Sequence, residues 1–454
     1  MQKFPARTRR NLAVAKAKED GGALKAGVPA WVAGRIVGIL DDGFVLQDQS
    51  GRVDIVYGGV VNAGDIVEIR LLPEEKIGME NMAFLVFHAR ELRVLAPCRE
   101  EFFIRGSDPN WKKMIIDTHR REVTQMRARM VEKIREFFRG KGFIETETPE
   151  MVRLPGMEPH LDPFKTVFTG QPSEGGNAAR EDMYLVTSPE YAMKKLLVAG
   201  HEKIFQIARS FRNRETAGIL HNPEFTLLEW YRAYADYTDI MKDTEELVNF
   251  LAGRICGGES FIFKDYKIDA KPPWPRRKVK DLFEEYAGID EKTLLDPALL
   301  RDAAKRKGYG IARDALYEDV FFLVFMNEIE QHMGITAPVI VYDYPKQMAA
   351  LARKSEADPR YAERFEAYIG GVELCNAFTE LNDPEEQEIR LRAECEQRKK
   401  AGKDCYSIDQ NFIGALKFGM PPSGGNALGV DRLAMVLTNT EDINDIMYFP
   451  FKDL

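Results

Sequence analysis

The sequence offers little that would hold a structural metal, a disulfide framework or a membrane anchor. It has no CxxC pair and no cluster of histidine and cysteine, and its five cysteines are scattered along the chain: Cys98, Cys256, Cys375, Cys395 and Cys405. This spacing favours a reduced protein without structural zinc. No apolar run is long enough to span a bilayer, and the basic N-terminus lacks the apolar core of a signal peptide. We therefore expect a cytoplasmic protein with no membrane partner.

An excess of positive charge is also absent. The formal net charge is -8 over 454 residues, so no overall basic field draws the protein to nucleic acid, although a local basic patch can still exist. Charged residues make up 30% of the chain and hydrophobic residues 44%, as in ordinary globular proteins. The length predicts two or three domains with a sizeable core.

The first 120 residues divide into three segments. Residues 1–27 are rich in lysine and arginine, and we expect a loose basic arm there rather than a short helix. Residues 28–97 contain five short β-rich runs separated by Asp-Asp-Gly, Ser-Gly and Ala-Gly turns, which predict a small β-barrel of the OB type. Residues 98–120 carry Gly106 and Pro109 and are predicted to be a linker.

Three aromatic residues of the predicted barrel, Trp31, Phe44 and Tyr57, are candidates for stacking on nucleic-acid bases. Aromatic side chains in so small a barrel more often pack in its core or at its rim, and residues 28–100 are not net basic. We therefore favour packing over base binding for these three residues.

Residues 121–454 are predicted to form one α+β domain. Apolar residues at helical spacing predict a helix that begins near Glu122 and ends at Gly140, followed by a short strand up to Pro149. Helices are predicted over most of 235–335, and a glycine-rich stretch from Gly419 leads into a last amphipathic helix. Further strands are predicted over four ranges: 205–211, 224–234, 337–345 and 364–381.

Polar residues on the first two of these strands are candidates for a site. Arg212 follows the strand 205–211, and Glu229 and Tyr231 alternate along the strand 224–234. An arginine at a strand end can bind a phosphate or a carboxylate bidentately, and two side chains that are two residues apart on a strand face the same side. A charged hairpin that is merely solvated fits the same pattern, so the functional interpretation depends on the rest of the chain.

Three other stretches carry candidates. Ser188 and Pro189 stand at the start of a helical pattern, where an N-cap can bind an anion or simply cap the helix. A strand pattern presents Glu373, Asn376 and Glu380. The C-terminal stretch contains glycines that permit a close approach of the backbone to a flat ligand, and an arginine that opens the next helix: Gly424, Gly425, Gly429 and Arg432.

These pieces occur in an order that is similar to a known family. The blocks TSPEYAMKKLLVAG, HNPEFTLLEWYR, GVELCNAFTEL and NALGVDRLAM resemble the lysyl-tRNA synthetase branch of the class II aminoacyl-tRNA synthetases over about residues 120–454. The residues of these blocks are most similar to those of the elongation factor P–lysine ligases, which are paralogues of lysyl-tRNA synthetase. The predicted barrel resembles the N-terminal OB domain of the class II synthetases for Lys, Asp and Asn. The helix and strand that close on Thr148–Pro149 resemble motif 1 of class II synthetases, which implies a homodimer.

The resemblance implies a reaction and a site. Adenylation joins an amino-acid carboxylate to the α-phosphate of ATP and expels pyrophosphate, so the enzyme needs cations and Mg²⁺ around the phosphates. By resemblance, Arg212 would hold the α-phosphate, Arg432 the γ-phosphate, and Glu373 and Glu380 the Mg²⁺ ion. The implied ATP site also includes Asn213, Glu215, Asn222, Leu374 and Gly429. The implied amino-acid pocket consists of Ser188, Pro189, Glu190, Glu229, Tyr231, Asn376, Glu380 and Ala427.

The implied amino acid is lysine or β-lysine, because Glu229 and Glu380 are natural partners for an ε-ammonium group. Two departures from the family stand out. Members of this branch usually read FRNE, whereas this chain reads Phe-Arg-Asn-Arg-Glu over 211–215, and we expect Glu215 to take the place of the usual glutamate while the loop absorbs Arg214. The elongation factor P ligases also lack an OB barrel.

Three functions are therefore compared. The first is activation of lysine or (R)-β-lysine and its transfer to a lysine side chain of elongation factor P, which Ala427 and the Trp230–Tyr231 pair favour, since lysyl-tRNA synthetases typically have glycine and Phe-Tyr at these points. The second is a lysyl-tRNA synthetase with a reduced anticodon domain that charges tRNA(Lys), which the barrel and the basic arm favour. The third is a non-catalytic paralogue that binds an amino acid or RNA, which the intact Arg212 and Arg432 disfavour.

Overall fold

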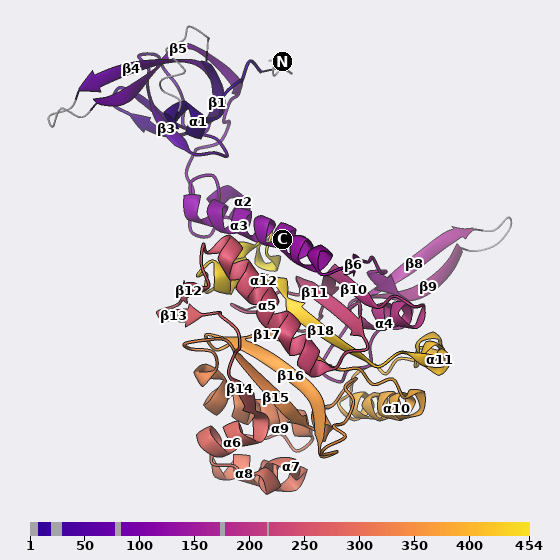
Figure 1. Cartoon of the computed structure of the whole chain (residues 1–454). Helices are drawn as coiled ribbons and strands as arrows, with labels where there is room; N and C mark the ends of the chain where they lie inside the picture. The colour runs from indigo at the N-terminus through magenta and orange to yellow at the C-terminus, as the bar shows by residue number, and fades with distance from the viewer. Residues whose placement is uncertain (1–7, 20–29, 78–82, 173–177, 216–217) are drawn as a thin grey trace. The chain divides into compact units, whose positions relative to one another are not determined.

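The computed structural model divides the chain into two compact units, Met1–Thr118 and His119–Leu454 (Figure 1). It describes residues 8–19, 30–77, 83–172, 178–215 and 218–454. Among these residues, no helix combines the length and the apolar character needed to cross a membrane. The two units are described separately.

The N-terminal unit is a closed five-stranded barrel, as the turn pattern predicts. Its strands follow the order β1-β2-β3-β5-β4 around the barrel. Alternating apolar side chains such as Val32, Leu46 and Ile69 fill the interior and are fully buried. The strands are β1 (Ala30–Leu40), β2 (Gly43–Gln47), β3 (Arg52–Val56), β4 (Ile66–Ile77) and β5 (Ala83–Ala96).

The aromatic residues of the barrel mainly serve packing. The Phe44 side chain is fully buried, and its ring meets the Tyr57 ring edge to face at a centroid distance of 6.1 Å. Trp31 is partly buried, and the Arg9 guanidinium lies 4.6 Å from its ring centroid. Phe44 is therefore a core residue and cannot stack on a base.

The expectation of a loose N-terminal arm is wrong for its central part. Helix α1 (Val14–Glu19) packs on the barrel, with Val14 and Ala17 fully buried. Asp48 Oδ2 accepts a hydrogen bond from the Val14 amide at 3.0 Å, and Ser50 Oγ accepts one from the Ala15 amide at 2.9 Å. These bonds satisfy amides in the first turn of the helix. Residues 1–7 and 20–27 of the arm lie outside the described residues.

The C-terminal unit is built on an eight-stranded sheet, which confirms the α+β fold class. The strand order is β14-β15-β16-β17-β18-β11-β10-β6, with parallel pairing only between β14 and β15 and between β10 and β6. The strands are β6 (Ile144–Glu145), β10 (Lys203–Phe211), β11 (Glu224–Ala233), β14 (Arg276–Lys278), β15 (Val339–Pro345), β16 (Tyr361–Ile369), β17 (Val372–Thr379) and β18 (Ser423–Gly429).

One face of this sheet packs against three helices (Figure 1). Trp230, Phe205 and Leu428 on the strands are fully buried against apolar residues of the helices, including Phe138 and Val436. The first helix confirms the predicted apolar stripe, because its buried residues recur at three- and four-residue spacing. The helices are α3 (Thr118–Gly140), α5 (Tyr237–Ile255) and α12 (Val430–Leu437).

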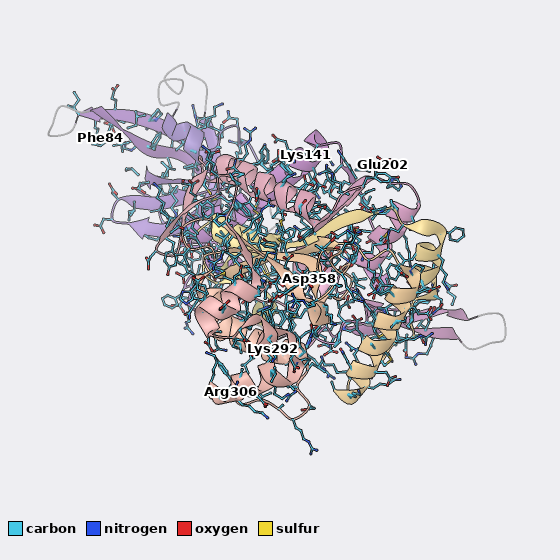
Figure 2. The ribbon with its side chains drawn as sticks, turned by 60° about the horizontal axis from the view of Figure 1, so that its bottom comes forward. Phe84, Lys141, Glu202, Lys292, Arg306 and Asp358 are labelled. Atoms are coloured by element: carbon cyan, nitrogen blue, oxygen red, sulfur yellow. A yellow bond between two sulfur atoms is a disulfide. The ribbon has the colours of Figure 1, made fainter. Side chains whose placement is uncertain are left out.

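On the opposite face of the sheet, two separate groups of helices pack against the strands. At the β14–β15 end, a helical layer forms its own core around Phe283 and Phe321, with Lys292 and Arg306 on its exposed surface (Figure 2). The layer agrees with the helices predicted over most of 235–335, and the last of them continues as a π-helix. The layer comprises α6 (Val279–Ala287), α7 (Glu291–Leu295), α8 (Pro297–Arg306), α9 (Tyr317–Val324) and the π-helix Phe325–Ile329.

At the other end, α4 (Glu190–Val198), α10 (Pro384–Lys400) and α11 (Gln410–Gly419) pack over the sheet. Met193 and Phe412 meet Tyr231 of the sheet in this core. A three-stranded sheet, ordered β7-β9-β8, lies beside α4: β7 (Met151–Val152), β8 (Lys165–Pro172) and β9 (Ala178–Leu185). The middle of the face between the two layers carries the candidate site.

A disulfide joins Cys395 in α10 to Cys405 in the loop after it. The expectation that all five cysteines stay reduced is therefore wrong for this pair. Cys98, Cys256 and Cys375 are free. The scattered spacing hid the pair because the helix end and the following loop bring the two residues together only in the fold.

Replacing both Cys395 and Cys405 by serine is expected to lower the free energy of unfolding by about 2–3 kcal/mol, because closing a loop of this length restricts the unfolded chain. The two residues are separated by 10 positions. Urea unfolding of the wild type with and without a dithiol reductant measures the effect. The double variant should not respond to the reductant, and identical curves for the wild type in both conditions would contradict the prediction.

Candidate active site

The site begins with a row of residues across the middle of the sheet. Glu229 of β11 pairs with Ala427 of β18, which pairs with Asn376 of β17, which pairs with Glu366 of β16. Directly opposed residues on neighbouring strands lie on the same face of a sheet. The row therefore places three predicted site residues, Glu229, Ala427 and Asn376, on the face opposite α3, α5 and α12.

A second row lies two residues further along each strand. It runs from Tyr231 through Gly425 to Phe378 and Arg364. Glu380 follows Phe378 by two residues and belongs to the same face. The carboxylates and the tyrosine that the sequence predicts for the amino-acid pocket are thus gathered by strand register, from segments more than 140 residues apart.

Glu373 reaches this face through a β-bulge. Strict alternation would turn Glu373, three residues before Asn376, to the helix-covered side. The pairing of β16 with β17 shifts between Ala367 and Tyr368, so that Glu373 lies opposite Tyr368. The extra residue, Leu374, packs in the core and is 1% exposed. The bulge therefore re-aims Glu373 toward the site, whereas the side chain of Leu374 does not line it.

Arg212 marks one end of the site. Its Nη1 lies 3.4 Å from Glu215 Oε1, and its guanidinium lies 4.9 Å from the Phe225 ring centroid. The Nε atom of Arg212 is buried and has no hydrogen-bond partner within the described residues. A buried donor left open in this way fits an anion such as a phosphate. Glu215 stands beside Arg212, and Arg214 is exposed with a left-handed φ of 63°.

Two asparagines that were predicted to bind ATP, Asn213 and Asn222, make hydrogen bonds to other residues of the protein. The Asn213 amide donates to the Asp162 carbonyl at 2.6 Å, and the Asn213 Oδ1 accepts from the Arg214 amide at 2.9 Å. Asn222 is buried, its Nδ2 donates to the Glu224 carbonyl at 2.7 Å, and its Oδ1 accepts from the Phe451 amide at 3.1 Å. Both asparagines therefore hold loops in place around Arg212.

Arg432 supplies a second cation near the site, where it contacts Glu373 and His221. Its Nη1 donates to Glu373 Oε2 at 3.1 Å, and its Nη2 lies 2.8 Å from His221 Nε2. Burial and the Arg432 charge lower the pKa of His221, so the ring is neutral and Nε2 accepts the bond. Sequence reasoning did not single out His221, although it stands in the HNPEF block.

Glu229 is the centre of the amino-acid end. Ser188 Oγ donates to Glu229 Oε1 at 2.6 Å, and the Tyr231 hydroxyl donates to Oε2 at 2.9 Å. The side chain is fully buried. Burial, with the nearby Glu190 charge, raises the pKa of Glu229 to about 8. Helix α4 begins at Glu190 with Pro189 as its N-cap, and Ser188 Oγ accepts from the Glu190 amide at 3.1 Å, so the predicted cap lies one residue earlier than a standard N-cap.

Lys194 binds two of the carboxylates. Its Nζ lies 2.6 Å from Glu190 Oε1 and 2.5 Å from Glu380 Oε2, and the Lys194 and Glu380 side chains are both fully buried. Sequence reasoning missed Lys194, although its position four residues after Glu190 on a helix is the spacing of an ion pair. The pKa of Glu380 is raised to about 8, because burial outweighs the attraction of Lys194.

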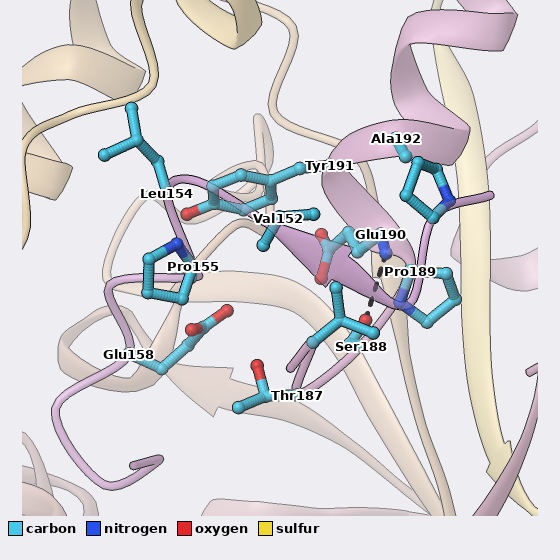
Figure 3. A pocket seen from close by; sticks show the side chains of 13 residues that line it. Val152, Leu154, Pro155, Glu158, Thr187, Ser188, Pro189, Glu190, Tyr191 and Ala192 are labelled. Carbon is cyan, nitrogen blue, oxygen red and sulfur yellow. Dashed lines mark hydrogen bonds between the residues drawn. The ribbon is translucent and has the colours of Figure 1, made fainter. Parts of the chain in front are cut away.

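A cavity opens beside these groups (Figure 3). The cavity is small, with room for the centres of water-sized groups over about 40 Å³, and the surrounding non-protein space of about 430 Å³ includes open solvent. Thr187, Ser188 and Glu190 form one side and Glu158 another, with the Tyr191 ring above (Figure 3). Burial, with the Glu190 charge, raises the pKa of the Glu158 carboxyl. After His221 and Lys194, Glu158 is a third residue of the site that the sequence pattern did not predict.

The space beside two of the glycines in β18 is filled by side chains of the protein, so it is not open to a ligand. A Cβ on Gly425 would lie 2.1 Å from Glu380 Oε1 and 2.5 Å from the Tyr231 ring, and a Cβ on Gly424 would lie 2.6 Å from Ile240. The expectation that Gly424 and Gly425 face a flat ligand is therefore wrong. A Cβ on Gly429 would meet only Arg432, at 3.7 Å, so that position remains open enough for a ligand.

The two carboxylates predicted to hold Mg²⁺ differ in their surroundings. Glu380 is buried against the Lys194 ammonium, which leaves little reason for a second cation there. Glu373 is partly exposed, and its charge helps to raise the pKa of Glu366 and that of Glu330. No group of three or more His, Cys, Asp or Glu side chains among the described residues is arranged to hold a metal. Glu373 therefore fits a divalent ion that is bound largely by substrate phosphates, whereas Glu380 already has the Lys194 ammonium as its partner.

The antiparallel sheet with this site on one face defines a class II synthetase-like ligase, and comparison with known proteins agrees. Residues 110–453 match the family model for class II tRNA synthetases (D, K and N). The chain is 34% identical to the lysine–tRNA ligase of Pelotomaculum thermopropionicum over 449 residues, 93% of this chain and 86% of the relative. It is 33% identical to that of Rhizobium meliloti over 475 aligned positions, 98% of this chain and 92% of the relative.

The match to the lysine–tRNA ligase of Clostridium tetani is 37% over 340 residues, 74% of this chain but only 65% of the relative. The chain belongs to the class II tRNA synthetase family (D, K and N).

Proposed function

We propose that the protein activates lysine with ATP as an aminoacyl-adenylate and transfers the lysyl group to tRNA(Lys). The observation that carries this proposal is the pairing of two unlike ends on one face of the sheet. An anion-binding end contains Arg212 and Arg432, and a buried acidic end contains Glu229 and Glu380. A substrate with a carboxylate to be activated and an ammonium to be recognised fits between two such ends.

In the first step, a carboxylate oxygen of lysine attacks the α-phosphorus of ATP. The new bond joins carboxylate oxygen and phosphorus, the bond to the β-phosphate oxygen breaks, and pyrophosphate leaves. Arg212 holds the α-phosphate with its open Nε donor, and Arg432 neutralises the leaving phosphates. A divalent ion at Glu373 would add positive charge to the phosphates.

In the second step, a ribose hydroxyl at the 3′ end of the tRNA attacks the lysyl carbonyl carbon, loses its proton and displaces AMP. The choice of tRNA as acceptor is supported by relatives named lysine–tRNA ligase that align across both units of the chain, the barrel included. A barrel of this kind commonly binds single-stranded nucleic acid.

Transfer of lysine or (R)-β-lysine to a lysine side chain of elongation factor P is the second candidate. The observation that favours it is the Ala427 methyl group, which lies in register between Glu229 and Asn376 on the floor of the amino-acid pocket. A methyl group at that point reduces the space around the backbone of the bound amino acid. This would favour a substrate whose amino group is displaced from the α-carbon, as in β-lysine.

Parallel reactions with ATP and labelled lysine or (R)-β-lysine, one with tRNA and one with elongation factor P, separate the two acceptors. We expect labelled tRNA with lysine and unlabelled factor. Label on the factor and none on tRNA would overturn the first candidate and support the second. Ala427→Gly is the matched variant, because it removes only the methyl group that favours the second candidate.

The pH dependence of lysine binding follows from Glu229. Its pKa of about 8 in the free protein means that the carboxyl is largely protonated below that pH, whereas an ammonium ligand needs the carboxylate. Lysine binding must then expel a proton, so the KM for lysine is expected to fall as pH rises toward 8, by up to roughly tenfold per pH unit. Steady-state pyrophosphate exchange between pH 6.5 and 8.5 measures it, with the KM for ATP as control. A KM for lysine that is constant with pH contradicts the assignment.

A further inference from the structure

A short segment, residues 158–162, connects the two ends of the site. At one end of it, Glu158 lines the cavity beside Glu190 (Figure 3). At the other end, the Asp162 carbonyl accepts the Asn213 amide at 2.6 Å, in an isolated antiparallel bridge. Asn213 directly follows Arg212. The position of this segment therefore bears on the amino-acid cavity and on the phosphate-binding arginine together.

The segment is held by Arg398, which comes from the last turn of α10 and has a fully buried side chain. Its Nη1 donates to the carbonyls of Glu158 at 2.8 Å and Leu161 at 2.7 Å. Its Nη2 donates to Asp162 Oδ1 at 2.8 Å. The Arg398 guanidinium thus binds both ends of the segment 158–162. It does so through the fixed, planar arrangement of donors that arginine has and lysine lacks.

Arg398 is itself fixed by its surroundings. Its Nε donates to the Asp404 carbonyl at 2.6 Å, and Asp404 adjoins Cys405 of the disulfide. The other half of the disulfide, Cys395, lies one turn before Arg398 on α10. Lys403 adds a second tether, because its Nζ donates to the Pro159 carbonyl at 2.9 Å and lies 3.2 Å from Asp162 Oδ2.

We propose that Arg398 is a positioning residue for the active site: through residues 158–162 it places Glu158 in the amino-acid cavity and fixes the strand end that carries Arg212. Arg398 is absent from the cavity lining, and its bonds to the segment are to two main-chain carbonyls and one carboxylate, so it acts through these residues and not on the substrate. The proposal rests on the proposed lysine activation for its kinetic consequences, but not for its structural ones.

The test compares Arg398→Met and Arg398→Lys with the wild type and with Arg392→Met. Arg392 lies on the same helix, and its exposed side chain bonds only Glu388 among the described residues, so this variant controls for the loss of an arginine from α10. Lysine-dependent ATP–pyrophosphate exchange gives kcat and the KM for lysine, and hydrogen exchange of the peptide around Asn213 reports the bridge to Asp162 directly.

For Arg398→Met we expect a roughly tenfold rise in the KM for lysine and a roughly tenfold fall in kcat, on the scale expected when loss of a supporting residue misplaces a site. Hydrogen exchange at Asn213 should be at least tenfold faster. Arg398→Lys should lie between this variant and the wild type, because lysine keeps the charge but not the fork, and Arg392→Met should match the wild type.

A kcat that falls only with the folded fraction, with unchanged KM and unchanged exchange at Asn213, would overturn the proposal. If Arg398→Met does not fold, Lys403→Ala decides: a twofold to threefold rise in KM with faster exchange at Asn213 supports it, and no change in either overturns it. A wild type without pyrophosphate exchange would refute the proposed function instead, and hydrogen exchange at Asn213 would still decide the role of Arg398.

Discussion

Replacing Arg212 by methionine is expected to lower kcat for lysine-dependent ATP–pyrophosphate exchange by about 10³-fold, because removing a fixed cationic donor from a developing phosphoryl charge has effects of this size. The open Nε donor of Arg212 and its place beside Phe225 make it the best-placed cation for the α-phosphate. Methionine keeps much of the side-chain length, so packing against Phe225 should survive.

Arg209→Met is the matched control for this experiment. Arg209 lies in β10, the strand that ends just before Arg212, and its side chain points to the opposite face, because side chains an odd number of residues apart point to opposite faces of a strand. Its ion pair with Glu224 joins two half-exposed side chains at 3.7 Å. We expect near wild-type exchange from this variant. Wild-type activity in Arg212→Met, or equal losses in both variants, would refute the role assigned to Arg212.

Replacing Glu229 by glutamine is expected to raise the KM for lysine about 100-fold, because an ammonium group would lose a buried anionic partner. The same change should not lower stability at pH 7. The pKa of Glu229 is about 8, so the folded protein holds this carboxyl neutral while the unfolded chain ionises it, and keeping the proton costs folding free energy that glutamine does not incur.

Exchange kinetics and urea unfolding, measured on the same preparation, separate the two effects of Glu229→Gln. Glu224→Gln, an exposed carboxylate on the same strand, is the control and should change neither quantity. A Glu229→Gln protein that loses several kcal/mol of stability with an unchanged KM would show that the carboxylate serves the fold rather than the substrate.

Local sequence patterns predicted much of the fold and part of the site. The alternation of Glu229 and Tyr231 on an apolar strand placed both on one face, and the structure has them there with Ser188. The turn residues of the barrel predicted its five strands, and apolar spacing predicted α3. These features depend on contacts within one strand, hairpin or helix, for which a short stretch of sequence carries enough information.

Features that depend on distant partners could not be predicted in this way. The orientation of Glu373 is set by a β-bulge that places it opposite Tyr368. No residue of β17 indicates this bulge in the sequence. In the sequence, Lys194 looks like an ordinary surface residue of a helix. Its role depends on Glu380, which lies almost two hundred positions later and contacts it only in the folded protein. The role of Gly425 likewise depends on the Tyr231 and Glu380 side chains that fill the space beside it.

We expect lysine to be activated between the Arg212 end and the Glu229 end of one sheet face. The most direct test is ATP–pyrophosphate exchange by the purified full chain with each of the common amino acids and (R)-β-lysine supplied singly. We predict exchange with lysine that exceeds exchange with aspartate or asparagine by at least 10³-fold, the discrimination expected when a buried charged pocket meets a substrate lacking the matching ammonium. Exchange that favours aspartate or asparagine, or no exchange with any amino acid, would contradict the claim.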